Sequence, residues 1–298
     1  MNNAAPIIVF TYNRIQETRA TLTALQQNNL AEMSELFVFS DGGKDNFDQQ
    51  KVTEVREYLK TINGFKRVEI FESESNQGLA NSVIRGVSDI LTRFDKVIVL
   101  EDDLVTTGNF LDFMNQALDF YQDCESVFSI SGYTMDLARL KQHPNDFYVG
   151  QRASSWGWAT WKDRWKDIDW EVSNYPSLKK RMAFYNVSSD MPGMLKKQMR
   201  GRIDSWAIRW CYHQFNRQLF TIFPTKSKVQ NIGMGENATH TRGDTKFKTP
   251  LDESGQTQFN FSKHLQTDKI IINQFKAKFS VQKRLYDKLS KIIRRQFS

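Results

Sequence analysis

The first 135 residues alternate short apolar runs with longer amphipathic segments. This rhythm is typical of βα units, in which mostly parallel strands are covered by helices on both faces. It predicts strands at residues 6–12, 35–42, 66–73, 96–103 and 127–133, and helices at about 15–27, 48–62, 79–93 and 109–121. The predicted fold class is therefore α/β and Rossmann-like, with a mostly parallel central sheet.

The βα rhythm ends after Gly150, and five of the seven tryptophans then fall between Trp156 and Trp170. A helical segment is predicted around residues 191–200, followed by Asp204 at the start of another helix. An apolar run at 219–224 and a polar, glycine-containing stretch at 227–247 come next. With 298 residues, 40% of them hydrophobic, the chain is long enough for one large catalytic domain, and it contains no internal repeat.

The formal charge of +7 is concentrated at the C-terminal end. Residues 275–298 contain eight basic residues against Asp287 alone, and the remaining chain is balanced at 33 basic and 33 acidic residues. Apolar residues recur between these charges at mostly helical intervals: Phe275, Phe279, Leu285, Leu289, Ile292, Ile293 and Phe297. We expect a basic amphipathic helix on an anionic membrane surface, with packing on the body or on a partner as the alternative.

The cysteines and the N-terminal residues indicate no secretion. Cys124 and Cys211 are the only cysteines and lack metal-ligand spacing, so we expect two reduced thiols. The strongest early apolar run, residues 7–10, is too short for a signal peptide or a spanning helix. A cytoplasmic protein, peripheral at most on the inner membrane face, is predicted.

The strand predicted at 96–103 ends in three adjacent carboxylates, Glu101, Asp102 and Asp103. These charges repel one another where solvent is partly excluded, and a divalent cation would relieve that repulsion. Mg²⁺ and Mn²⁺ prefer such oxygen ligands and complete their shell with water and substrate phosphates. The alternative is a solvated turn in which Asp103, Thr106 or Thr107 caps the next helix, and spacing alone does not separate the two.

Two further predicted strands also end in polar loops. Asp41 precedes two glycines, in a pattern that suits a nucleotide-holding acceptor but also an ordinary turn. Asn76 and Gly78 precede a helix on which Asn81 and Arg85 are spaced i, i+4. Because ligands bind beyond the carboxyl ends of parallel strands, these loops together favour a nucleotide-diphosphate site with a metal.

The segments "PIIVFTYNR", "SDGGKD", "NQGLANSVIRG" and "VIVLEDDLVTTGNF" resemble, in this order, the nucleotide-binding half of a GT-A-fold glycosyltransferase. The acidic triplet occupies the place of that fold's DxD-type motif. The likeness extends from about residue 6 to residue 241 and is strongest to bacterial sugar transferases of the N-acetylglucosaminyltransferase I type and to family-2-like sugar transferases. It implies a donor-binding half at 1–135, an acceptor and catalytic-base half of the same domain at 136–265, and the tail at 266–298.

The resemblance also implies roles for residues of the donor side. Asp103 would bind Mn²⁺ or Mg²⁺, Asp102 would contact the donor ribose, and Glu101 would support the site. Arg14 and Asp41 would hold the nucleotide, with Asp41 near the base. The remaining donor-binding residues implied are Thr11, Asn76, Gly78, Asn81 and Arg85, of which the last two would face the diphosphate sugar.

On the acceptor side, the resemblance implies that Asp204 is the general base of an inverting transfer. The alternative from sequence alone is that Asp204 is only a helix N-cap. Trp156, Trp158 and Trp206 could form an aromatic acceptor platform, although core packing accounts equally well for large aromatic residues. His240 could be a further metal or phosphate ligand on a closing loop, or an ordinary surface histidine.

These inferences predict a metal-dependent inverting glycosyltransferase that uses a nucleotide-diphosphate sugar, with UDP-sugar as first choice. The acceptor would be a glycan or glycolipid in surface polysaccharide or lipopolysaccharide synthesis. The alternatives are a sugar nucleotidyltransferase, which uses a similar fold and metal, and a non-catalytic binding module whose tail binds nucleic acid or an acidic partner. No nucleic-acid partner is expected for the transferase.

Overall fold

A computed structural model of the chain describes residues 4–175, 177–233, 247–280 and 282–283. The strands are β1 (Ile7–Thr11), β2 (Glu35–Ser40), β3 (Arg67–Glu72), β4 (Lys96–Glu101), β5 (Leu104–Thr106), β6 (Val127–Ser131), β7 (Phe147–Gly150), β8 (Trp158–Trp161), β9 (Phe220–Pro224) and β10 (Val229–Asn231). The α-helices are α1 (Ile15–Gln26), α2 (Asn46–Leu59), α3 (Leu79–Arg93), α4 (Phe110–Tyr121), α5 (Lys162–Trp165), α6 (Leu178–Val187), α7 (Met191–Gln198), α8 (Trp206–Asn216) and α9 (Lys269–Lys278). Short 3₁₀ helices lie at Ala31–Met33 and Ala138–Gln142.

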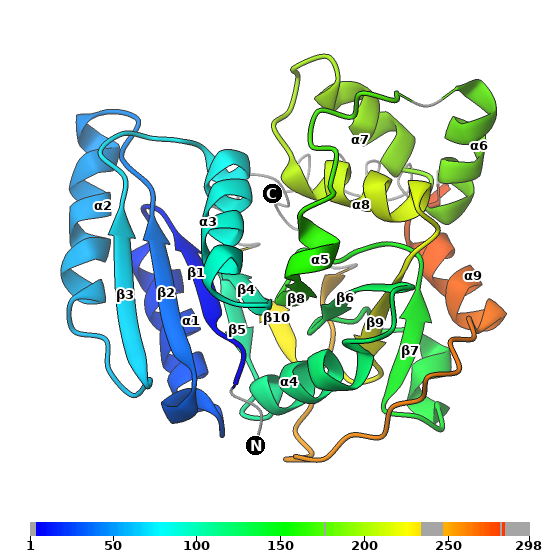
Figure 1. The fold of residues 1–298 in the computed structure, drawn as a ribbon, viewed down its shortest axis with the longest axis horizontal. Coiled ribbons are helices and arrows are strands. Elements are labelled where there is room, and N and C mark those ends of the chain that lie inside the picture. The colour runs from blue at the N-terminus through cyan, green and yellow to red at the C-terminus, as the bar shows by residue number, and fades with distance from the viewer. Residues whose placement is uncertain (1–3, 176, 234–246, 281, 284–298) are drawn as a thin grey trace, which may run out of the picture.

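The described residues form an eight-stranded central sheet with the order β3-β2-β1-β4-β8-β6-β9-β7 (Figure 1). Strands β3, β2, β1 and β4 pair in parallel, as do β6 and β9, which confirms the predicted α/β fold with a mostly parallel sheet. Strand β8 was not predicted. It pairs antiparallel with both β4 and β6, so it joins the second half of the chain to the first in one sheet.

The period-two alternation of side chains along the strands builds a core on each face of the sheet. Ile7 and Val9 of β1 pack into one core with residues of α1, α2 and α4. Ile8 and Phe10 point to the other face and pack with residues of α3 and α8. Because β1 is buried on both faces, its first four residues, 7–10, are all apolar, and this apolar run is the reason that it was predictable.

The tryptophans of the second half lie mainly inside the second core. Trp158 and Trp206 are only 1% and 3% exposed, and their ring centroids lie 5.1 Å apart. Trp210 packs on Trp158 with a centroid distance of 4.4 Å. The predicted acceptor platform is therefore wrong for Trp158 and Trp206, because buried rings that join β8 to α8 cannot contact a sugar.

The C-terminal segment begins with α9, which packs against the body of the protein. Ile271 and Phe279 are buried, and Phe275 packs against the same core. The guanidinium of Arg152 lies over the Phe279 ring at 4.4 Å from its centroid. For Phe275 and Phe279 the predicted membrane-facing position is therefore wrong, and the alternative of packing on the body holds. Residues 284–298 of the predicted tail lie outside the described residues.

No helix within the described residues is long and apolar enough to cross a membrane.

Candidate active site

The candidate site lies at the sheet edge where the parallel strands end. Strands β1, β2, β3 and β4 all point to this edge, so the loops that follow them meet there. In Figure 1, α7 and α8 lie on the same side of the molecule as the arrowheads of β2 and β3. The second half of the chain thus faces the edge to which sequence reasoning assigned the donor.

The acidic triplet forms the turn between β4 and β5, and Thr21 of α1 fixes this turn. The Thr21 hydroxyl donates to the Asp102 carbonyl at 2.8 Å and accepts from the Leu104 N–H at 3.0 Å. From the other side, the Ile232 N–H donates to the Asp103 carbonyl at 2.8 Å. Sequence reasoning missed Thr21, because a threonine on the buried face of a helix gives no signal of such a contact.

Arg14, which was predicted to hold the nucleotide, lies directly on the acidic pair. Its guanidinium donates to Asp103 Oδ2 at 3.0 Å and forms an ion pair with Asp102 Oδ1. The second oxygen of Asp102 accepts from the Tyr12 N–H at 3.3 Å. Both oxygens of the buried Asp102 are therefore engaged by the chain, and its predicted contact with ribose would require Arg14 to move.

Burial disfavours the charged forms of Glu101 and Asp102 and raises the pKa of each. Burial, followed by repulsion from Asp103 and Asp102, raises the pKa of Glu101 to about 8. Burial also raises the pKa of Asp102 to about 6, although Arg14 and the Tyr12 N–H act in the opposite direction. A further positive charge beside these groups would oppose both shifts, as Arg14 already does in part.

Asp103 and Asn231 offer the oxygens that fit a hard divalent cation. Asp103 Oδ1 is buried and has no hydrogen-bond partner among the described residues, and the same holds for Asn231 Oδ1. Asn231 belongs to β10, which pairs with β5 directly after the acidic turn. The backbone of Gly233 crosses close to Asp103, because a Cβ at position 233 would lie 2.2 Å from Asp103 Oδ2. A buried unpaired oxygen is costly, so it marks a place for a ligand.

This donor set provides few protein ligands. The described residues contain no group of three or more His, Cys, Asp and Glu side chains that could hold a metal ion. A site with one or two carboxylates suits Mg²⁺ or Mn²⁺, which retain water and bind substrate phosphates. Zn²⁺, which favours a closed set of nitrogen and sulfur ligands, would fit this site poorly.

Asp41 orders the neighbouring loop instead of offering a free oxygen. Its carboxylate accepts from the N–H groups of Gly42, Gln77 and Gly78 at 2.9, 2.8 and 3.0 Å. The side-chain amide of Asn76 donates to it at 3.1 Å. A carboxylate has about four acceptor positions, so these four bonds use them all. The predicted roles of Asp41 at the base and of Asn76 at the donor are replaced by mutual bonds that fix the loop after β3.

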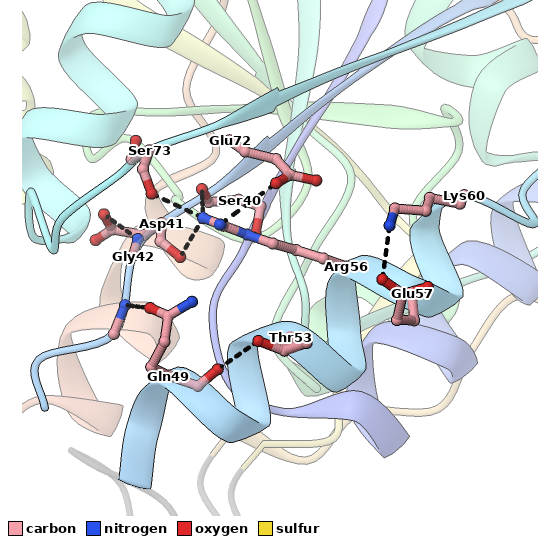
Figure 2. Close-up of polar contacts among 11 residues, drawn as sticks. Ser40, Asp41, Gly42, Gln49, Thr53, Arg56, Glu57, Lys60, Glu72 and Ser73 are labelled. Atoms are coloured by element: carbon pink, nitrogen blue, oxygen red, sulfur yellow. Dashed lines mark hydrogen bonds and ion pairs between the residues drawn. The ribbon is translucent and has the colours of Figure 1, made fainter. Parts of the chain in front are cut away.

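Arg56 of α2 secures the same loops and was missed by sequence reasoning. Figure 2 shows its guanidinium between the ends of β2 and β3, where it donates to Ser40 Oγ at 3.1 Å and to the Ser73 carbonyl at 2.8 Å. The Gly43 N–H also donates to Gln49 Oε1 at 2.9 Å. Nothing in the sequence distinguishes Arg56 from a surface arginine, because its partners are mostly backbone carbonyls.

The start of α3 has the features of an anion-binding helix end. Gly78 precedes the helix with φ of 78°, a conformation that favours glycine, and no side chain caps this terminus. No acidic residue lies in the first turn. Asn81 and Arg85 are exposed and both donate to Gln77, at 3.1 and 3.5 Å, so they lie on one face as their spacing predicted. Phosphate binds readily at such a terminus.

Asp204 lies between α7 and α8, one residue before the cap of α8. Ser205 is the N-cap, and its hydroxyl accepts from the Ile208 N–H at 3.4 Å. The alternative that Asp204 is only an N-cap is therefore wrong. Asp204 Oδ1 accepts from Arg209 at 3.3 Å, and Oδ2 lies 4.0 Å from the position of a Cβ on Gly78. The structure thus brings Asp204 to the start of α3.

Three predicted site residues remain. Trp156 is partly exposed and contacts the rings of Tyr133 and Phe247, with centroid distances of 4.6 and 5.2 Å. Thr11 is buried at the end of β1, and its hydroxyl has no hydrogen-bond partner among the described residues. His240 lies in 234–246, outside the described residues, so its predicted role stays a prediction.

Comparison with known sequences decides the family. The profile described as "Glycosyl transferase family 2" matches residues 7–195, from β1 into α7. The chain belongs to glycosyl transferase family 2. The match spans β1, the acidic turn and β8, and it confirms the predicted glycosyltransferase resemblance. The predicted likeness to the N-acetylglucosaminyltransferase I type stays a prediction. No curated protein matches this family 2 chain.

Solved structures of glycosyltransferases resemble the chain only remotely. The crystal structure of Staphylococcus aureus TarS 1-349 is 12% identical, with a TM-score of 0.43, over 77% of this chain and 60% of that one. The mannosyltransferase PcManGT from Pyrobaculum calidifontis, in complex with GDP-Man and Mn²⁺, is 15% identical, with a TM-score of 0.38, over 54% of this chain and 45% of that one. The chain thus spans 45% and 60% of the lengths of these proteins, and similarity this low assigns no substrate.

Proposed function

We propose that this family 2 protein transfers a sugar from a nucleotide-diphosphate donor, with UDP-sugar as first choice, to a carbohydrate acceptor, and that it uses Mn²⁺ or Mg²⁺. The observation that supports this most is the unpartnered, buried Oδ1 of Asp103 at the end of β4. The turn that carries it is fixed by Thr21 and Arg14, so the oxygen is held in place before any ligand arrives.

Asp103 would hold the metal, and Asn231 offers a second oxygen near it in the fold. When bound, the metal stabilises the negative charge of the departing diphosphate. Arg14 neutralises Asp102 and Asp103 in the meantime and would shift as the donor enters. Glu101, with its raised pKa, would support the site from the last position of β4.

The donor diphosphate would lie at the uncapped start of α3. The first-turn N–H groups there point outward, and the exposed Arg85 lies on the adjoining face of the helix. Asp41, Asn76 and Arg56 hold this loop through their own hydrogen bonds, so they would position the donor without touching it.

Asp204 would act as the general base. As the acceptor hydroxyl oxygen forms its bond to the anomeric carbon, the proton passes to the Asp204 carboxylate. The bond from that carbon to the diphosphate oxygen breaks, with its electron pair leaving on the phosphate. Attack from the face opposite the leaving group inverts the anomeric centre. The exposed Asp204 is not used as a cap and adjoins the start of α3, which suits this role.

The Asp204→Asn substitution tests this assignment. The amide keeps the size of the side chain but cannot accept the proton, and the cap at Ser205 is untouched. We expect the transfer rate to fall by about 10²–10⁴-fold with donor affinity unchanged. Asp163→Asn is the matched control, because Asp163 is 56% exposed beside an arginine and Asp204 is 59% exposed beside one. Turnover of Asp204→Asn near that of the control would remove Asp204 from the mechanism.

Residues 1–135 would bind the donor and residues 136–265 the acceptor, with Trp156 as the remaining aromatic acceptor contact. The acceptor would be a glycan or glycolipid of surface polysaccharide or lipopolysaccharide synthesis, at the inner face of the cytoplasmic membrane. Release of pyrophosphate from a nucleoside triphosphate and a sugar phosphate would instead indicate a nucleotidyltransferase.

A further inference from the structure

Helix α6 carries apolar side chains on its exposed surface as well as on its buried side. Phe184 points inward and is fully buried. Leu178, Met182 and Tyr185 are 67%, 64% and 46% exposed, and their i, i+4, i+7 spacing places them in one line along the helix. We call these three residues the α6 stripe. Single exposed apolar residues are common on proteins, but a line of three along one helix marks an interaction surface.

The surroundings of the α6 stripe are strongly basic. Residues 178–202 contain one acidic residue, Asp190, which pairs with Arg152 at 3.0 Å. Within the described part of the chain, none of the basic residues of this segment has a carboxylate partner. These residues are Lys179, Lys180, Arg181, Lys196, Lys197, Arg200 and Arg202. The chain before the tail has equal numbers of acidic and basic residues, but basic residues are in excess on α6, α7 and the loop after α7.

The two helices form one part of the molecule. Figure 1 shows α6 and α7 together at the top right, away from β1–β3. The exposed Met199 follows α7 and adds a further apolar side chain beside Lys196 and Lys197. Basic side chains thus flank apolar ones on both helices, and no acidic residue except the paired Asp190 interrupts them.

We infer that the α6 stripe and these basic residues form a docking surface for a membrane with anionic lipids. The apolar side chains would enter the boundary between headgroups and acyl chains, while the lysines and arginines bind lipid phosphates. Charge complementarity selects this occupant, because an anionic surface can bind several basic side chains that lack a carboxylate partner within the described residues, such as the exposed Lys179, Lys196 and Lys197. The surface differs from the predicted tail, whose described aromatic residues pack on the body.

The position of this surface suggests what docking would do for the reaction. This step rests on the proposed function. The segment after α7 leads directly to Asp204, the proposed base. Docking through α6 and α7 would therefore bring the acceptor side of the site close to the bilayer. A sugar acceptor that is linked to a lipid holds its hydroxyl near the membrane surface. Docking would therefore raise the local concentration of the acceptor at the site.

The test measures vesicle binding of the full chain and needs no activity. Wild-type protein should bind phosphatidylcholine vesicles that contain phosphatidylglycerol, and should bind pure phosphatidylcholine weakly. The variant L178E/M182E/Y185E should bind the anionic vesicles at least about tenfold more weakly. The matched control is M33E/F47E/I270E, whose parent residues are 52%, 66% and 53% exposed elsewhere on the surface. It should bind as the wild type does.

A second variant, K196E/K197E, should weaken binding and reduce its dependence on salt, since fewer cations are then screened. Circular dichroism confirms that each variant is folded. Anionic-vesicle binding of the stripe variant equal to wild type, or an equal loss in the control, would overturn the inference. So would wild-type self-association that the stripe variant abolishes, without vesicle binding, because it would assign the surface to a second copy. Loss of vesicle binding with intact transfer to a soluble acceptor leaves the proposed function standing.

Discussion

Arg14 provides the sharpest test of how the acidic turn is held together. Its guanidinium contacts Asp102 and Asp103 at once, and both aspartates are buried. The substitution Arg14→Met keeps an apolar stem of similar length and removes the charge. Two carboxylates then remain in a buried turn without their shared partner.

The loss of stability follows from burial and from the pKa of Asp102. Removing one partner of a buried ion pair costs about 3–5 kcal/mol. The Arg14 side chain is 31% exposed, so solvent screens part of this interaction. The pKa of Asp102 is already raised to about 6, so this group can take up a proton and limit the cost at lower pH. We expect a loss of about 2 kcal/mol at pH 8, and less at pH 6.

The measurement is thermal unfolding in EDTA, where this loss corresponds to a Tm lower by about 4 °C. If Asp103 binds a divalent cation, the cation and the guanidinium compete for the same carboxylates. Mn²⁺ should therefore stabilise Arg14→Met more than wild type. Arg85→Met is the control, because Arg85 is exposed and contacts an amide. A variant as stable as wild type in EDTA, or an equal Mn²⁺ shift in both proteins, would refute this reasoning.

Two further perturbations test electrostatics elsewhere in the fold. The folded-state pKa of Glu101 is raised from 4.5 to about 8, so its contribution to stability is present below pH 4.5 and is lost as the pH rises through 8. In EDTA, Glu101→Gln should therefore unfold like wild type at pH 5 and be more stable at pH 9; parallel pH profiles would contradict this. Lys228→Met should cost about 3–5 kcal/mol in urea unfolding, because the buried Asp252 that pairs with Lys228 loses its partner. The exposed pair of Lys60 and Glu57 is the control, and Lys60→Met should leave the urea midpoint nearly unchanged because solvent screens that pair.

The sequence predicted the sheet well where strands are buried on both faces. The apolar runs of β1 and β4 are short, continuous and followed by polar residues, and both ends of each strand fall within two residues of the prediction. Strand β8 was missed because its sequence, "WATW", is short and lies among tryptophans that gave no βα rhythm. Its position is determined by its pairing with β4 and β6, and the sequence of β8 alone does not reveal these partners.

The sequence predicted which residues lie at the strand ends better than it predicted the contacts that those residues make. The strand-end position of Asp41 was predictable, but its four hydrogen bonds depend on how the loop after β3 folds back onto it. The contact of Arg14 with Asp103 joins residues 89 positions apart, which no local pattern reveals. Likewise, the balanced charge total concealed the basic surface on α6 and α7, because a sum carries no information about where charges lie.

The central claim is that Asp103 holds a divalent cation which the nucleotide needs. Its most direct test is the binding of Mn²⁺, followed by electron paramagnetic resonance in the presence of UDP, to wild type, Asp103→Asn and the control Asp163→Asn. We expect wild type and the control to bind Mn²⁺ and UDP together, and Asp103→Asn to bind Mn²⁺ at least about 100-fold more weakly. Equal Mn²⁺ binding by Asp103→Asn, or UDP binding to wild type that is unchanged in EDTA, would contradict the account.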